Sequence, residues 1–196
     1  MQMQTMIMNF LLGVLEYFVF GAVLIFYVRK VEKAPLSSLG LKKVRFTDIV
    51  KGLLLGICMF IVQQIPLLIL KMDYSAYAMA PDPFYIIAVP LYCFFCVGFV
   101  EELIFRGFIL QKTLAVCHSK TVSILINILL FYAVHFFPAM RFSFGEFYSI
   151  AVNVLFLSIY FFKSKDKTLI PLIVAHGFYD TMTSVLLPLF IYALGH

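Results

Sequence analysis

The chain has 196 residues, 63% of them hydrophobic and 13% charged, with a mean hydropathy of +1.02 and a formal net charge of +5. Soluble globular proteins hold roughly 45–50% apolar and about 25% charged residues, so this composition excludes that class and predicts an integral membrane protein. Because a spanning helix takes about 20 apolar residues, a single membrane domain is expected to fill residues 1–196 and leaves no room for a sizeable soluble domain.

Six apolar runs predict an all-α, polytopic transmembrane bundle of about six spanning helices. In chain order they are residues 6–28, 49–70, 84–110, 122–137, 147–162 and 169–192. No basic segment precedes the first run and no small-residue cleavage site follows it, so it predicts a spanning helix rather than a signal peptide. Pro90 lies inside the third run, which is long enough to tilt, kink or end in an amphipathic turn.

The loops between these runs differ sharply in charge. Twelve lysines and arginines belong to the loops after the first, third and fifth runs, against Lys71 and Arg141 in the alternate loops. Because cytoplasmic loops carry the positive excess, we expect both termini outside and three short loops in the cytoplasm. The same rule accounts for the net charge, so the bilayer is the expected partner and no nucleic acid is predicted. Compact loops predict a multi-pass protein of a prokaryotic plasma membrane.

The cysteines and two glycines predict packing rather than chemistry. Four cysteines lie in or beside apolar runs: Cys58, Cys93, Cys96 and Cys117. They are expected to be reduced, and the CxxC among them lacks the second pair that a zinc site of this type needs. Gly52 and Gly56, four residues apart in the second run, predict the close approach of another backbone, within or between molecules.

Charged residues lie deep in the third run, where Glu101, Glu102 and Arg106 follow an apolar stretch. An ionisable residue inside a membrane is a functional-site candidate. Positions four apart share a helix face, so Glu102 and Arg106 are expected to form an ion pair. Glu101 is turned about 100° away and must find another partner, for which histidines on other helices are available.

Those histidines are His135 in the fourth run and His176 in the sixth, with Asp180 one turn beyond His176 on the same face. At about 1.5 Å per residue, His135 comes out about 20 Å from the cytoplasmic side, and His176 and Glu101 about 10–15 Å. We therefore expect a glutamate, two histidines and an aspartate to converge in one layer. Taken singly, each group is equally consistent with a hydrogen bond or ion pair between helices, and Phe131 with packing.

Together these residues resemble the CPBP family of intramembrane proteases, which includes the CAAX prenyl endopeptidases and bacteriocin-processing or self-immunity proteins. The family pattern EExxxR is met by Glu101, Glu102 and Arg106, FxxxH by Phe131 and His135, and HxxxN or HxxxD by His176 and Asp180. The three motifs lie in the expected order on three predicted helices. The resemblance predicts a CPBP-like catalytic core over residues 84–187, whereas the first two helices match only as apolar spans.

The resemblance implies that Glu101 and His135 activate the attacking water while His176 and Asp180 stabilise the oxyanion. By the same resemblance, Glu102 and Arg106, with Phe131, are structural support. An ionised aspartate only accepts hydrogen bonds, whereas the asparagine that the family pattern also allows can donate from its amide. Asp180 is therefore expected to be a protonated donor, to orient His176, or to bind a metal.

A metal ion is left open by the same residues. Glu101, His135 and His176 have the side-chain types of hydrolytic zinc sites, yet no HExxH motif is present. A divalent metal such as zinc and a metal-free site are both consistent with the sequence.

Three functions compete. The first is an endopeptidase that cleaves a membrane-associated peptide or protein, for example a prenylated or pheromone-like peptide. The second is a non-catalytic membrane scaffold or bacteriocin self-immunity protein that binds a partner in the bilayer. The third is a proton-coupled carrier, which ranks lowest because the chain shows no repeats or paired broken helices. Substrate identity and oligomeric state stay open.

Overall fold

The structure is a computed structural model and describes residues 2–69, 78–140 and 142–195. This part of the chain is helical with no strand, and six helical stretches in it are long and apolar enough to cross a membrane. These are Ile7–Val31, Phe46–Pro66, Pro83–Cys117, Lys120–Phe137, Phe144–Lys163 and Ile170–Ala193. The predicted all-α bundle with about six spanning helices is thereby confirmed.

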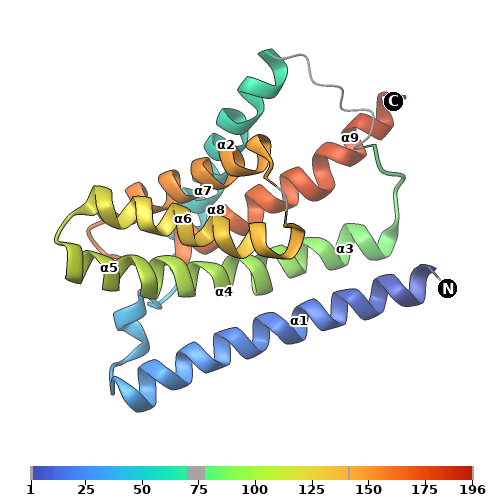
Figure 1. Ribbon diagram of the computed structural model, residues 1–196. Helices are drawn as coiled ribbons and strands as arrows, with labels where there is room; N and C mark the ends of the chain where they lie inside the picture. Colours follow the sequence, from blue (N-terminus) through green and yellow to red (C-terminus); the bar gives the residue numbers. More distant parts are fainter. Residues whose placement is uncertain (1, 70–77, 141, 196) are drawn as a thin grey trace.

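Short connections join the last four spans to one another, whereas residues 32–45 separate the first span from the second (Figure 1). The first, second, fourth and fifth spans are α1 (Gln2–Phe26) with the π-helical turn η1 (Tyr27–Val31), α2 (Phe46–Ile69), α6 (Lys120–Ala139) and α7 (Phe144–Lys163). The third span joins α3 (Pro83–Tyr92), η4 (Cys93–Gly98), α4 (Phe99–Glu102), η5 (Leu103–Ile109) and α5 (Leu110–Cys117). The sixth joins α8 (Ile170–Thr181), η6 (Met182–Leu186) and α9 (Leu187–Ala193).

The third span is longer than its apolar run predicted, and it ends at Cys117 rather than at residue 110. Its last segment, α5, mixes polar with apolar residues, so hydropathy alone does not mark it as helix. His118 ends it in the left-handed conformation, with φ of 53°. Beyond Pro90, which has no N–H to donate, the helix continues as the π-helical η4. Such π segments are frequent at functional sites.

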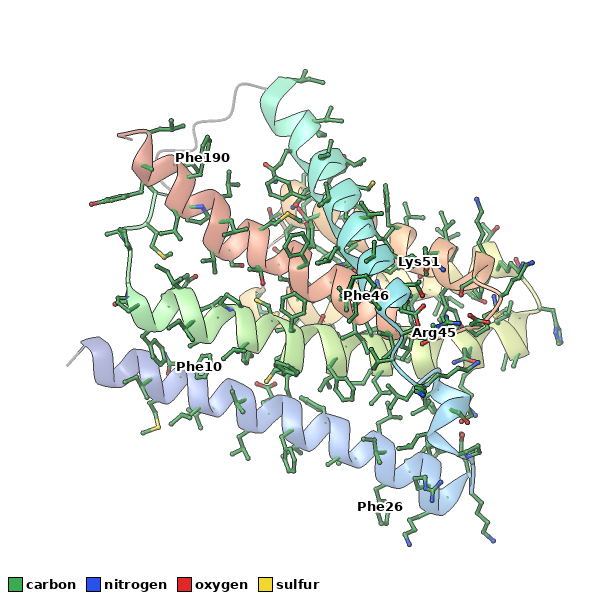
Figure 2. The ribbon with its side chains drawn as sticks, turned by 180° about the vertical axis from the view of Figure 1, so that it is seen from behind. Phe10, Phe26, Arg45, Phe46, Lys51 and Phe190 are labelled. Atoms are coloured by element: carbon green, nitrogen blue, oxygen red, sulfur yellow. The ribbon has the colours of Figure 1, made fainter. Side chains whose placement is uncertain are left out.

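The basic loops lie together at one end of the bundle. Arg45 forms ion pairs with Asp48 at 2.8 Å and with Asp166 of the α7–α8 loop at 2.7 Å. Lys112 of α5 pairs with Glu32 beyond α1 at 2.6 Å. Figure 1 places both termini toward the opposite end, and Figure 2 shows Arg45 at the start of α2. Which end faces the cytoplasm stays a prediction.

Close backbone contacts fix α2 against α8. A Cβ added to Gly52 would lie 2.7 Å from the carbonyl oxygen of Pro171, and one added to Gly56 would lie 2.8 Å from that of Ala175. The close approach predicted for the two glycines is therefore confirmed, and it occurs within the molecule. Because small residues let helix backbones meet, this contact fixes α8 at the centre of the bundle.

The interior of the bundle combines an apolar core with a group of buried polar side chains, and large apolar side chains cover much of its outer surface. Fully or almost fully buried polar side chains include Glu102, Arg106, Asn127, Asn153 and His176, whereas aromatic side chains such as Phe18, Phe95 and Phe190 are more than 60% exposed. All four cysteines are unpaired, as predicted. Buried charge is thus concentrated where α4 and η5 face α7 and α8.

The first helix, α1, packs along the third span, beside η4 and α4 (Figures 1 and 2). Between them runs an apolar groove of about 760 Å³. Its lining includes Tyr17, Gly21 and Ala22 of α1 and Phe95 and Val100 of the third span. Arg29 and Lys30 lie at its end, next to the basic loops. The groove borders the span that carries the buried charges.

Candidate active site

A fully buried ion pair forms the base of the site. Arg106 Nη1 donates to Glu102 Oε1 at 2.8 Å, and both side chains are 0% exposed. The pair predicted from the spacing of four is therefore present. Arg106 Nη2 also donates to Asn153 Oδ1 of α7 at 2.7 Å. A second helix thus supplies a hydrogen-bond acceptor for the guanidinium, as buried charge requires.

His176 of α8 connects this pair to the rest of the site. Its Nδ1 donates to Glu102 Oε1 at 2.8 Å, so Glu102 accepts from both His176 and Arg106. This bond fixes the ring and directs Nε2 away from Glu102. Nε2 lies 3.8 Å from Glu101 Oε2 and 3.5 Å from Asp180 Oδ2. Glu102 therefore orients the histidine in addition to pairing with Arg106.

Glu101 presents one bonded and one free oxygen. Oε1 accepts a hydrogen bond from the hydroxyl of Tyr17 at 2.6 Å. Oε2 is buried and has no hydrogen-bond partner within the described part of the chain. Glu102 Oε2 and Arg106 Nε are also without a partner in this part of the chain, so the site has unused hydrogen-bonding capacity that another group can satisfy. Oε2 of Glu101 is the oxygen that faces His176.

His135 lies beside this group without bonding to Glu101 among the described residues. Its Nδ1 donates to the carbonyl oxygen of Phe131, one turn earlier in α6, at 2.8 Å. The Phe131 ring stacks on His135 with centroids 4.9 Å apart, and it lies under the Arg106 guanidinium at 5.2 Å. The same Phe131 ring lies beside the ring of His176, with centroids 6.2 Å apart. The histidine therefore flanks the acidic group across the aromatic ring.

The predicted metal ligands are not arranged as a ligand set. In the described part of the chain, no three His, Cys, Asp or Glu side chains form a group that would hold a metal ion. Glu101 and His176 face each other, whereas Nδ1 of His135 is hydrogen-bonded to the carbonyl oxygen of Phe131 in its own helix. A metal at this site therefore stays a prediction.

Two glycines let η4, which leads to the two glutamates, pack closely against α8, which carries His176. A Cβ on Gly98 would lie 2.9 Å from the carbonyl oxygen of Ile173, and one on Gly177 would lie 2.8 Å from the Cα of Phe94. Gly98 comes one turn before Glu101 and Glu102, and Gly177 directly follows His176. Backbone contact between η4 and α8 therefore sets the distance between the glutamates and the histidine.

Replacing Gly177 by alanine should separate η4 from α8. The new methyl group meets backbone, which cannot move aside, so we expect a loss of about 1–3 kcal/mol of stability, as is typical of overpacking, together with reduced activity. Thermal unfolding in detergent measures the first effect. Gly145→Ala is the control, because nothing lies within 4 Å of that position. Equal unfolding temperatures for the two variants would contradict the close contact.

Sequence reasoning missed three polar residues around the site. Tyr17 bonds Glu101, Asn153 bonds Arg106, and Asn127 Nδ2 donates to the carbonyl oxygen of Phe105 in η5 at 2.9 Å. The two asparagines carried a usable signal, because a polar residue within an apolar run is unusual. A tyrosine in a chain with 11 of them carried none.

Comparison with known proteins gives one match. A family model described as type II CAAX prenyl endopeptidase Rce1-like matches residues 83–182, just over half of the chain. The matched part includes Glu101, Glu102, Arg106, His135 and His176, together with Asp180. No curated protein and no solved structure matches the chain.

Proposed function

The chain belongs to the Rce1-like family of type II CAAX prenyl endopeptidases, and from this we propose that it hydrolyses a peptide bond of a lipid-bearing peptide at the level of Glu101 and His176. The family match confirms the predicted CPBP resemblance and implies a multi-pass membrane protease of the CAAX type. The substrate and the roles of individual residues are our proposal.

One observation carries the proposal. The free oxygen of Glu101 and the Nε2 of His176 lie 3.8 Å apart, too far for a direct hydrogen bond. A water molecule set to one side of this line would reach both atoms. Glu101 is 8% exposed and His176 3% exposed, so such a water would be shielded from bulk solvent. Peptide hydrolysis needs a water held and activated in this way.

The reaction then proceeds in two steps. The water oxygen forms a bond to the scissile carbonyl carbon, and its proton passes to Glu101. His176, protonated on both nitrogens, donates from Nε2 to the oxygen that becomes negative, while Glu102 holds Nδ1. In the second step the carbon–nitrogen bond breaks, and the leaving amine takes the proton from Glu101. Donors fixed before the reaction are what oxyanion stabilisation requires.

Asp180 and His135 take supporting positions in this scheme. Asp180 Oδ2 lies 3.5 Å from His176 Nε2, one helix turn along α8, and helps to hold the ring in place. His135 has one nitrogen bonded to the Phe131 carbonyl, so its other nitrogen is available to accept a proton from the water or the peptide. Both placements support the predicted participation of these residues.

The groove beside α1 supports a substrate with a lipid chain. Its lining is mainly aliphatic and aromatic, its volume is about 760 Å³, and Tyr17 joins it to Glu101. An isoprenoid or acyl chain lying there would bring an attached peptide to the carboxylate. Arg29 and Lys30 at the far end favour an anionic group near the basic loops.

The test uses detergent-purified protein and two quenched-fluorescent peptides that differ only in a farnesyl group. We expect cleavage of the farnesylated peptide with a lower KM. Ala22→Phe fills part of the groove and should displace about two methylene groups of the lipid chain from it. The loss of their burial should raise that KM about tenfold. The substitution should leave the KM of the plain peptide unchanged. Val23→Phe, on the exposed face of α1, is the matched control.

The same assay decides between the open alternatives. Cleavage that persists with a chelator supports the metal-free scheme, whereas loss of activity that zinc restores supports the predicted metal. Equal KM values for both peptides would exclude the groove as the lipid site. No cleavage of any peptide would favour the scaffold or self-immunity alternative.

A further inference from the structure

We propose that Tyr17 of α1 is a positioning residue for the reaction, which holds Glu101 so that one oxygen faces His176 and the water. This inference rests on the proposed function and extends it to a helix outside the matched residues 83–182. Tyr17 lies more than 80 positions from Glu101 in sequence.

The contact leaves Glu101 with a single usable oxygen. A carboxylate has two equivalent oxygens and rotates about its last bond unless one of them is bound. The Tyr17 hydroxyl donates to Oε1 at 2.6 Å, the short distance expected for a hydrogen bond to a charged acceptor. Oε2, which has no partner in the described residues, is thereby directed toward Nε2 of His176. Without the hydroxyl, the carboxylate would sample other orientations.

The face of α1 around Tyr17 has small residues that allow close packing against the third span. Gly13 and Gly21 lie one turn before and one turn after Tyr17, so all three share a helix face. A Cβ on Gly13 would lie 2.8 Å from the Tyr92 hydroxyl, and one on Gly21 would lie 3.4 Å from a methyl group of Val100. Small residues on both sides thus let α1 come close to the third span.

The ring of Tyr17 is held from a second direction. It packs edge-on against the ring of Tyr92, with centroids 5.6 Å apart. Tyr92 in turn contacts Phe10, one helix turn beyond Gly13 toward the N-terminus, with centroids 5.4 Å apart. Figure 2 shows Phe10 on α1 beside the third span. Aromatic packing therefore fixes the ring of Tyr17. Little conformational entropy is then lost when its hydroxyl bonds Glu101.

The test is Tyr17→Phe, which keeps the ring and removes only the hydroxyl. The free energy of a hydrogen bond to a charged group corresponds to a factor of about 10 to 100 in a rate constant. We therefore expect kcat on the farnesylated peptide to fall by that factor. KM and the unfolding temperature should stay within about twofold and a few degrees of wild type, because the groove and packing remain. Tyr27→Phe is the matched control, because Tyr27 lies at the other end of the same span with its ring packed against Phe108, and it should leave kcat unchanged.

The outcomes separate this inference from the function on which it rests. Wild-type kcat in Tyr17→Phe, with Glu101→Gln inactive, overturns the role of Tyr17 and leaves the protease intact. A loss that appears in KM, or together with a lower unfolding temperature, also overturns it, because that pattern belongs to packing. A wild-type protein that cleaves nothing overturns both.

Discussion

Glu101→Gln is expected to lower the rate of peptide cleavage by about 10²- to 10⁴-fold, the contribution typical of a general base. Glutamine has the same shape, and its carbonyl oxygen still accepts the hydrogen bond from Tyr17. The amide nitrogen that replaces Oε2 takes no proton from water. The effect should therefore fall on kcat, measured with the farnesylated peptide, while the unfolding temperature and membrane insertion stay as in wild type.

The matched control is Glu146→Gln in the first turn of α7, where the Ser143 hydroxyl caps the helix through the backbone and not through the glutamate side chain. It should cleave at the wild-type rate. If Glu101→Gln retained full activity, Glu101 would not be the base. If it cleaved nothing and yet fully replaced the wild-type protein in cells, the scaffold alternative would gain support.

Arg106→Met should destabilise the protein by about 3–5 kcal/mol, the usual result of removing one partner of a buried ion pair. Methionine fills much of the same volume, so the loss comes from charge. Glu102 loses a donor at 0% exposure, and Asn153 loses its bond to the guanidinium. Phe131 also loses the cation above its ring. The midpoint of thermal unfolding in detergent gives the measurement.

Two comparisons separate charge from packing. Lys112→Met removes a lysine that is 51% exposed and whose partner Glu32 is itself accessible, and surface pairs contribute only about 0–1 kcal/mol. Adding Glu102→Gln to Arg106→Met removes the stranded charge, so the double variant should unfold at a higher temperature than Arg106→Met alone. If the double variant were the less stable, buried charge would not be the cause.

The sequence predicted most accurately what depends on a single helix. Hydropathy located six spans, and the spacing of four located the Glu102–Arg106 pair, because both follow from local geometry. The meeting of Glu101 with His176 was also anticipated, since the depth of each residue along its own helix was readable. The third span ended late because α5 is amphipathic, and hydropathy does not record helicity.

The order of helices around the bundle was not predictable from these patterns. Hydropathy indicates how deep a residue lies in the membrane but not which helices are neighbours. The sequence patterns therefore did not predict that α1 packs beside the third span or that Tyr17 bonds Glu101. The spacing of Gly13 and Gly21 marks a face for close packing without naming its partner. The contact of Gly177 with Phe94 likewise depends on a pairing of helices that only the structure supplies.

The Glu102–Arg106 pair has a consequence for biosynthesis. Asn153 and His176, which complete its hydrogen bonds, lie 47 and 74 residues from their partners Arg106 and Glu102, in spans that are synthesised later. A lone charge at the centre of a membrane helix costs about 2.5–3.5 kcal/mol on insertion scales. Glu102 and Arg106 lie one turn apart on the same helix, so their charges compensate each other as soon as the third span enters the bilayer. The span can therefore insert before the later helices that complete the site are synthesised.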